Sequence, residues 1–108
     1  MGVNAAIWRW TEAYDNSSKR HRLHTKMGNV HDAIMDGDTH AAQAEFDQPS
    51  FVTDLEKELG PQAPEGDWIA EFYDKAVVIN MSNSLAVEWL PRIQRVANRH
   101  KLNVVAEL

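Results

Sequence analysis

The spacing of hydrophobic and polar positions divides the chain into segments of strand-like and helix-like character. Residues 3–10 are rich in apolar β-branched and aromatic side chains, which is typical of a β-strand. Between residues 23 and 34 apolar side chains recur every three or four positions, which predicts helix. We expect a break in that helix at Gly28-Asn29, because glycine favours helix ends. Residues 39–50 show neither period, and no element is predicted there.

The second half of the chain shows clearer periods. Residues 51–59 carry apolar side chains at every fourth position and predict a short helix, with Ser50 as its N-cap. Two β-rich runs at residues 68–73 and 76–81, separated by two residues, predict a hairpin. An amphipathic helix is expected over residues 85–100, and a last strand from Leu102 to Glu107.

The order of these elements is β-α-β-β-α-β in a chain of 108 residues. That length suits one domain, so residues 1–108 are interpreted as a single α+β domain. Right-handed crossovers would convert this order into a ferredoxin-like fold. We therefore expect a four-stranded, mostly antiparallel sheet with both helices on one face and with the first and third strands at its centre.

The predicted strands carry large apolar side chains on both sides, although a sheet covered on one face should be polar on the other. Either Phe46 and the segment 39–50 cover the second face, or that face is an interface. We favour an interface, with a homodimer as the first expectation and another protein partner as the second. Tryptophan is enriched at interface centres. The candidate interface residues are Trp8, Trp10, Trp68 and Phe72.

Composition excludes several kinds of chemistry. The chain has no cysteine, which rules out disulfides, thiolate zinc sites, iron–sulfur clusters and cysteine nucleophiles. No stretch approaches the roughly 20 apolar residues that span a bilayer, and no signal peptide is recognised. We expect a cytoplasmic protein without membrane contact. The net charge of −5 argues against general nucleic-acid binding, although basic residues gather in segments 19–26 and 92–101.

The segment 21–40 is the one place where metal ligands are frequent. Neutral imidazoles and carboxylates with this spacing can bind zinc or a similar ion. The neighbouring basic residues, Lys19, Arg20, Arg22 and Lys26, would repel a cation, so we expect no metal and no cofactor. A small metal-dependent enzyme or metal-binding protein remains the alternative hypothesis. Its candidate ligands are His21, His24, His31, Asp36, Asp38 and His40.

Motifs for nucleophilic catalysis and phosphate binding are missing from the sequence. The serines stand where helix caps are wanted, and none lies in a Gly-x-Ser-x-Gly turn. The five glycines are scattered and form no phosphate-binding loop. We therefore expect no catalytic residues and a protein that is not an enzyme.

Short motifs give the chain a resemblance to two groups of proteins. It resembles a family of small uncharacterised bacterial single-domain α/β proteins in Trp8-Arg9-Trp10, Asp36-Gly37-Asp38-Thr39-His40 and Phe46-Asp47. Its C-terminal half is similar in layout to immunity proteins of bacterial toxin systems. The residues that carry this second resemblance are Phe51, Leu55, Trp68, Val77-Val78-Ile79, Ile93, Ala97 and His100-Lys101-Leu102.

The resemblance implies no catalytic residues and favours a role in binding another protein. The leading hypothesis is therefore a non-enzymatic protein-binding domain, with neutralisation of a partner toxin as its most concrete form. The isoelectric point near 5.4 suits a basic partner. A structural homo-oligomer of unknown role is the third hypothesis, beside the metal-dependent alternative.

Overall fold

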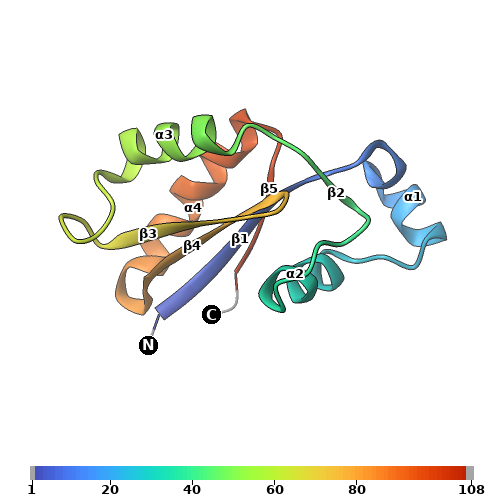
Figure 1. The fold of residues 1–108 in the computed structure, drawn as a ribbon, viewed down its shortest axis with the longest axis horizontal. Coiled ribbons are helices and arrows are strands. Elements are labelled where there is room, and N and C mark those ends of the chain that lie inside the picture. The colour runs from blue at the N-terminus through green and yellow to red at the C-terminus, as the bar shows by residue number, and fades with distance from the viewer. Residues whose placement is uncertain (1, 107–108) are drawn as a thin grey trace.

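The computed structural model of the chain describes residues 2–106 and measures 44 × 27 × 22 Å along its principal axes. Four α-helices and five strands make up this part of the chain, together with one turn of 3-10 helix, η1 (Figure 1). In chain order the elements are β1 (Gly2–Trp10), η1 (Glu12–Tyr14), α1 (Ser17–Arg22), α2 (Met27–Met35), β2 (Gln43–Ala44), α3 (Gln48–Leu59), β3 (Trp68–Tyr73), β4 (Ala76–Ser82), α4 (Asn83–Arg99) and β5 (Asn103–Ala106).

The strands form one antiparallel sheet in which β1 and β4 lie beside each other in the middle. β3 pairs with the outer side of β4, and β5 pairs with the other side of β1. The two-residue β2 pairs with Arg9 and Trp10 at the end of β1, beyond its pairing with β4. The predicted α+β class with a mostly antiparallel sheet is confirmed. The predicted number of four strands is wrong, because the described residues form five. The additional strand, β2, has two residues and is too short to show a period in the sequence.

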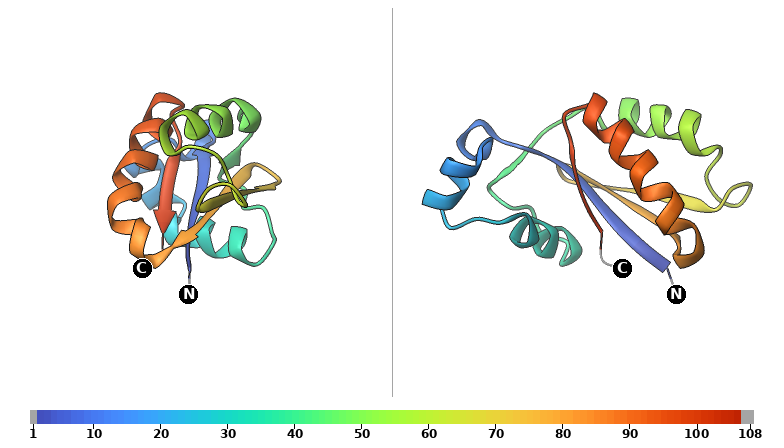
Figure 2. Two further views of the ribbon diagram at one scale, coloured as in Figure 1. Left: turned by 90° about the vertical axis from the view of Figure 1, so that its left-hand side faces the viewer. Right: turned by 180° about the vertical axis from the view of Figure 1, so that it is seen from behind.

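Helices cover both faces of the sheet, so the prediction of helices on one face is wrong. Helices α3 and α4 pack on one face, and α2 packs on the other (Figures 1 and 2). We call these the helix-pair face and the α2 face. The buried residues of the helix-pair face are Val3, Ala5, Ile7, Phe51, Val52, Leu55, Trp68, Val77, Ile79, Met81, Ala86, Trp89, Ile93, Val96, Ala97 and Leu102. Those of the α2 face are Ala6, Trp8, Val30, Ile34, Ala42, Ala76 and Val78.

This second cluster explains why both sides of the strands are apolar. Val30 and Ile34 of α2, with Ala42 from the following segment, cover Trp8 and its neighbours in the sheet. Phe46, which one of the two alternatives placed over that face, packs against the helix-pair face. The α2 face is therefore occupied over its apolar part by the chain itself, which removes the reason for placing a homodimer there.

The break between the first two helices lies earlier than the sequence suggested. Helix α1 ends at Arg22, and His24 has a positive φ of 52° in the turn that follows. Gly28 and Asn29 lie inside the first turn of α2. The Asn29 side chain accepts a hydrogen bond from the backbone N–H of Lys26 at 2.8 Å and so caps the first turn of α2.

Helix α3 also begins earlier than predicted, at Gln48. Its N-cap is Asp47, not Ser50, because Asp47 Oδ1 accepts from the Ser50 N–H at 3.1 Å. Pro49 is tolerated in this first turn, where backbone N–H groups lack helical partners.

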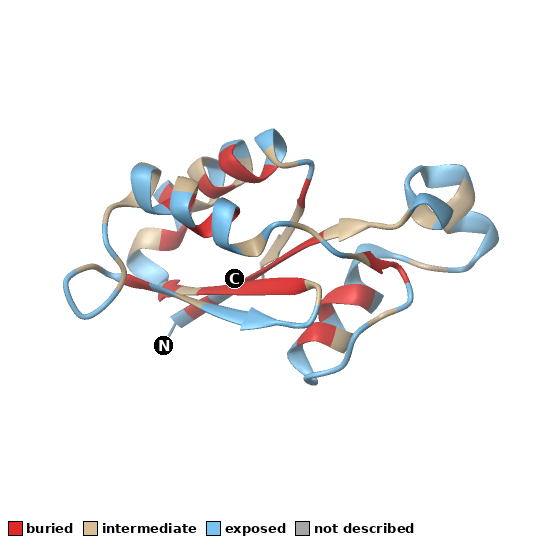
Figure 3. Cartoon of the chain, turned by 45° about the horizontal axis from the view of Figure 1, so that its top comes forward, coloured by how far each residue is buried: buried red, intermediate tan, exposed pale blue. Residues whose placement is uncertain are grey.

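The predicted hairpin is confirmed at β3 and β4, and the last helix is confirmed at α4. The last strand is confirmed at residues 103–106, while Glu107 lies outside the described residues. Figure 3 shows burial concentrated in the central strands and on the inner sides of α2, α3 and α4. Helix α1 has no buried residue. Across residues 2–106, no helix is both long enough and apolar enough to cross a membrane.

Candidate functional site

The predicted metal ligands at the start of segment 21–40 lie in different surroundings. His21 in α1 and His24 in the next turn are exposed. His31 is buried on the inner side of α2, where its Nδ1 lies 3.5 Å from Oδ1 of Asp32. The buried His31 of α2 and the exposed His21 and His24 do not share a coordination centre.

The remaining predicted ligands have structural roles or face solvent. Asp36 and Asp38 are exposed at the end of α2. His40 Nδ1 accepts a hydrogen bond from the Ala42 N–H at 3.0 Å, and its ring meets Tyr14 edge-on. Between residues 2 and 106, no three His, Asp or Glu side chains gather where they could hold a metal ion. The metal-dependent alternative therefore has no ligand set in this part of the chain.

Two of the four predicted interface residues are buried within the chain. Trp8 is fully buried beneath α2, and Trp68 is 1% exposed under the helix pair. Trp68 Nε1 donates to the carbonyl of Gly60 at 3.1 Å. Both rings are large enough to fill the space between sheet and helices, and neither is available to a partner.

Trp10 is half-buried near the end of β1 in a small aromatic group. Its ring stacks on Tyr14 with centroids 6.4 Å apart, and it meets Trp8 edge-on. The guanidinium carbon of Arg20 lies 4.7 Å from the centroid of the Trp10 ring, within the range of a cation–π contact. These contacts fix the ring against η1 and α1, and its role in binding stays a prediction.

Phe72, the fourth predicted interface residue, is 55% exposed on β3. Ile69 and Tyr73 on the same strand are 41% and 37% exposed. Side chains alternate along a strand, so Phe72 lies on the helix-pair side and the other two lie on the α2 side. We call these three side chains, with the outer edge of β3 between them, the β3 surface. It offers apolar contacts on both sides of one edge strand.

The edge of β3 is closed over its first half and open over its second half. Alternate residues of a strand direct their N–H and C=O groups to the same edge. The Ala70 N–H donates to Gln62 Oε1, and the Trp68 carbonyl accepts from the Ala63 N–H, both at 2.8 Å. By the same alternation the groups of Phe72 also face outward. The Ala70 carbonyl and both backbone groups of Phe72 have no partner among residues 2–106.

Carboxylates surround the β3 surface. Four acidic residues fall between positions 65 and 75, where Lys75 is the one basic residue. All four are exposed, and none forms an ion pair with another described residue. They are Glu65, Asp67, Glu71 and Asp74. The β3 surface therefore combines an apolar centre with a negative surround.

A charged contact away from this surface joins the two helices of the helix-pair face. His100 Nε2, just after α4, lies 2.6 Å from Oδ2 of Asp54 in α3. The hydrogen bond from His100 lowers the pKa of Asp54 below its ordinary value of 3.8. The His100 ring also meets Phe51 edge-on. Because 46 positions separate the two residues, no pattern in the sequence indicated the pair.

Sequence reasoning found Phe72 but missed its partners on β3. Ile69 and Tyr73 belong to the apolar alternation of this strand and were not named as candidates. The signal that could have identified them is the acidic run around the hairpin, because covered strands are rarely flanked by unpaired carboxylates. Comparisons of the chain with protein-family models, curated proteins and solved structures found no match.

Proposed function

We propose that the chain is a protein-binding domain that docks its partner on the β3 surface. The observation that carries this proposal is an edge strand with three large exposed apolar side chains, an open carbonyl at Ala70 and an open backbone at Phe72. An open edge strand is a template for another strand, and flanking side chains then give specificity. The partner would add an extended segment whose side chains contact Phe72 on one side and Ile69 and Tyr73 on the other.

Charge selects the class of partner. The unpaired carboxylates around the β3 surface favour a segment in which apolar residues are flanked by lysine or arginine. A second copy of this chain would bring Glu71 and Asp74 near the same residues of its neighbour, and like charges across paired strands are destabilising. A different, basic protein is therefore favoured over the homodimer expected from the sequence.

Neutralisation of a toxin is the specific form of this function that we propose. The resemblance of the C-terminal half to immunity proteins supports it, as does the acidic β3 surface. Toxins that act on nucleic acids carry basic surfaces for phosphate, and an acidic domain can cover such a surface. A ferredoxin-like arrangement is proposed with it, supported by the position of β1 between β4 and β5.

The test uses calorimetry at low and high salt to measure binding between the purified chain and an extended peptide whose apolar residues are flanked by lysine. Phe72→Lys places a charge in the centre of the β3 surface and should weaken binding about tenfold or more, or about 1.4 kcal/mol. Val87→Lys is the matched control, because Val87 is 79% exposed on α4, away from the β3 surface. Wild-type affinity should fall with salt.

Two results would contradict the proposal. Equal affinity of the Phe72→Lys and wild-type proteins would show that the partner docks elsewhere. Light scattering after size exclusion provides the second readout. A wild-type dimer that Phe72→Lys converts to a monomer, with Val87→Lys still dimeric, would assign the β3 surface to a second copy instead of a basic partner.

A further inference from the structure

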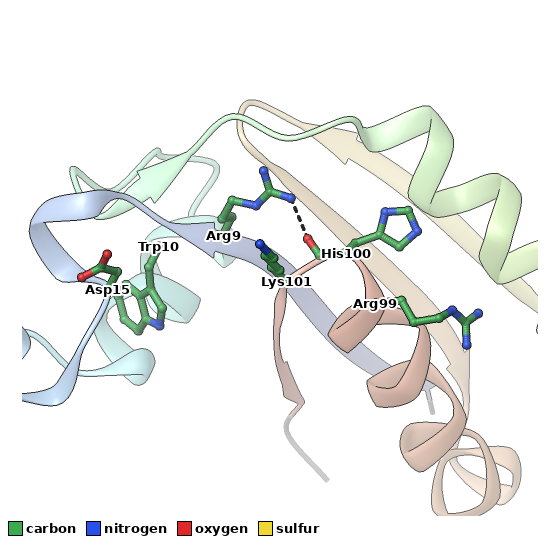
Figure 4. A pocket seen from close by; sticks show the side chains of 6 residues that line it. All are labelled: Arg9, Trp10, Asp15, Arg99, His100 and Lys101. Atoms are coloured by element: carbon green, nitrogen blue, oxygen red, sulfur yellow. Dashed lines mark hydrogen bonds between the residues drawn. The ribbon is translucent and has the colours of Figure 1, made fainter.

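An open hollow lies where the end of β1 meets the end of α4 (Figure 4). Its volume is about 670 Å³. The wall is formed by residues from the end of β1, from the turn between η1 and α1, and from the second basic stretch, 92–101. The lining residues are Arg9, Trp10, Asp15, Arg99, His100 and Lys101. This hollow is separate from the β3 surface, and none of its lining residues belongs to β3.

The charge of the hollow is opposite in sign to that of the whole protein. Arg9, Arg99 and Lys101 line it, and none of them forms an ion pair with a residue in the range 2–106. The one carboxylate in the lining, Asp15, is already paired with Lys19, whose Nζ lies 2.9 Å from Oδ1. Unpaired cations therefore dominate this surface in a chain with a net charge of −5.

Arg9 is held in place while most of its donors stay free. Its Nη2 donates to the carbonyl of His100 at 2.6 Å, as drawn in Figure 4. This carbonyl at the end of α4 would otherwise present partial negative charge to the hollow. The Arg9 Nε is buried without a hydrogen-bond partner. A guanidinium has five N–H donors. A guanidinium that is held in place and uses few of these donors within the protein is suited to bind an oxyanion.

Lys101 has a backbone conformation that glycine would adopt more easily. Its φ is +58°, directly after α4, where the Leu102 N–H donates to the carbonyl of Ala97 at 2.9 Å and closes the helix end. Glycine is the usual residue at this left-handed position. A lysine there carries a conformational cost, and strained residues that persist cluster at functional sites. What the lysine adds, relative to glycine, is an unpaired ammonium group in the lining of the hollow.

We propose that this hollow binds a small tetrahedral oxyanion, namely a phosphate group carried by a small molecule. The planar guanidinium of Arg9 would contact two of its oxygens, and the ammonium of Lys101 would neutralise the second charge. Trp10 also lines the hollow, and its partly exposed ring, which leaves β1 on the side opposite to Arg9, would offer an apolar contact to the rest of the molecule. Arg20, stacked over that ring, adds positive charge behind it.

The test compares two lysine-to-glycine substitutions. Lys101→Gly removes the cation and relieves the positive φ. Lys75→Gly is the matched control, because Lys75 has a φ of +55° in the turn between β3 and β4 and lines no part of this hollow. Both variants should unfold at a higher temperature than the wild type, because glycine fits the left-handed conformation. Only Lys101→Gly should lose anion affinity, about tenfold, as expected when a charged contact is removed.

Binding is followed by chemical shifts in ¹H–¹⁵N spectra at low ionic strength, with inorganic phosphate, glycerol phosphate and succinate as probes. The expected result is a saturable shift at Arg9 and its neighbours with both phosphates. Absence of saturation with either phosphate would overturn the proposal, as would equal affinity of the wild type and Lys101→Gly. Preference for succinate would overturn the assignment to a tetrahedral oxyanion. The outcome is independent of binding at the β3 surface.

Discussion

The apolar side chains on the helix-pair face and on the α2 face of the sheet are buried in different ways. On the helix-pair face two long helices pack on β1 and β4, where Val3, Ala5 and Ile7 of β1 and Val77, Ile79 and Met81 of β4 form an apolar surface. On the α2 face one helix of nine residues covers one end. At the other end of the α2 face the strands turn polar, with Asn4 exposed and Asn80 half-buried.

This difference shows that apolar residues on a second face do not by themselves indicate an interface. Ala6, Trp8 and Val78 are apolar because α2 packs on them, and the strands become polar where that cover stops. Three large exposed apolar side chains gather instead at the edge of the sheet, on β3. Docking in this molecule is therefore expected at a strand edge.

The largest effect is expected from truncation on the helix-pair face. Ile93 is fully buried at the centre of α4, and Ile93→Ala should cost about 2–5 kcal/mol in the free energy of unfolding. Urea denaturation measures this loss. Val87→Ala on the exposed side of the same helix is the control and should stay within about 0.5 kcal/mol of wild type. A loss at Ile93 as small as that of the control would contradict the observed packing.

A smaller effect is expected on the α2 face. Ile34 is also buried, but the cluster around it is smaller and has one covering helix, so the site can relax around the cavity. We expect Ile34→Ala to cost about 2 kcal/mol, at the lower end of the range for such truncations. Hydrogen exchange should show faster opening of α2 while α4 stays protected.

The control for this second truncation is Met35→Ala, a neighbouring position that is 38% exposed. It should change neither the stability nor the exchange of α2 by a comparable amount. If Ile34→Ala destabilised the protein as much as Ile93→Ala and accelerated exchange in both helices equally, the two faces would form one cooperative core. The two faces would then not differ in how much they contribute to the free energy of unfolding.

Periodicity predicted the elements of the second half well, because each is long enough to repeat a pattern. The stripe Leu85, Trp89, Ile93 and Val96 of α4 and the alternation in β4 are examples. The starts of elements that depend on a single capping contact were predicted at the wrong residues. The start of α3 depends on Asp47 and the start of α2 on Asn29, and each side chain could have capped in more than one register.

Placement of α2 on the second face could not be predicted from its own sequence. Its apolar stripe fits either side of the sheet, and the choice depends on the chain path through residues 36–47. The candidate surfaces were predicted only in part, because they also depend on the path of the folded chain. Phe72 was found from its residue type. The hollow at Arg9 and Lys101 depends instead on two segments about 90 positions apart, and the hydrogen bond from Arg9 to the His100 carbonyl joins them only in the folded chain.

The smallest effect concerns a contact that only the helix-pair face has, the pair of Asp54 and His100 between α3 and α4. Because the hydrogen bond from His100 lowers the pKa of Asp54 below 3.8, the unfolded chain binds this proton at a higher pH than the folded chain does. The contribution to stability is therefore present above pH 3.8 and is lost as the pH falls through the lowered pKa of the folded state.

Asp54→Asn removes that titration, so its stability should fall below that of wild type at neutral pH and converge on it in acid. Urea denaturation as a function of pH measures the difference. Asp67→Asn, an exposed carboxylate without an ion pair to a described residue, is the control and should follow the wild-type curve in parallel. Parallel curves for Asp54→Asn and wild type would show that the pair does not stabilise the fold.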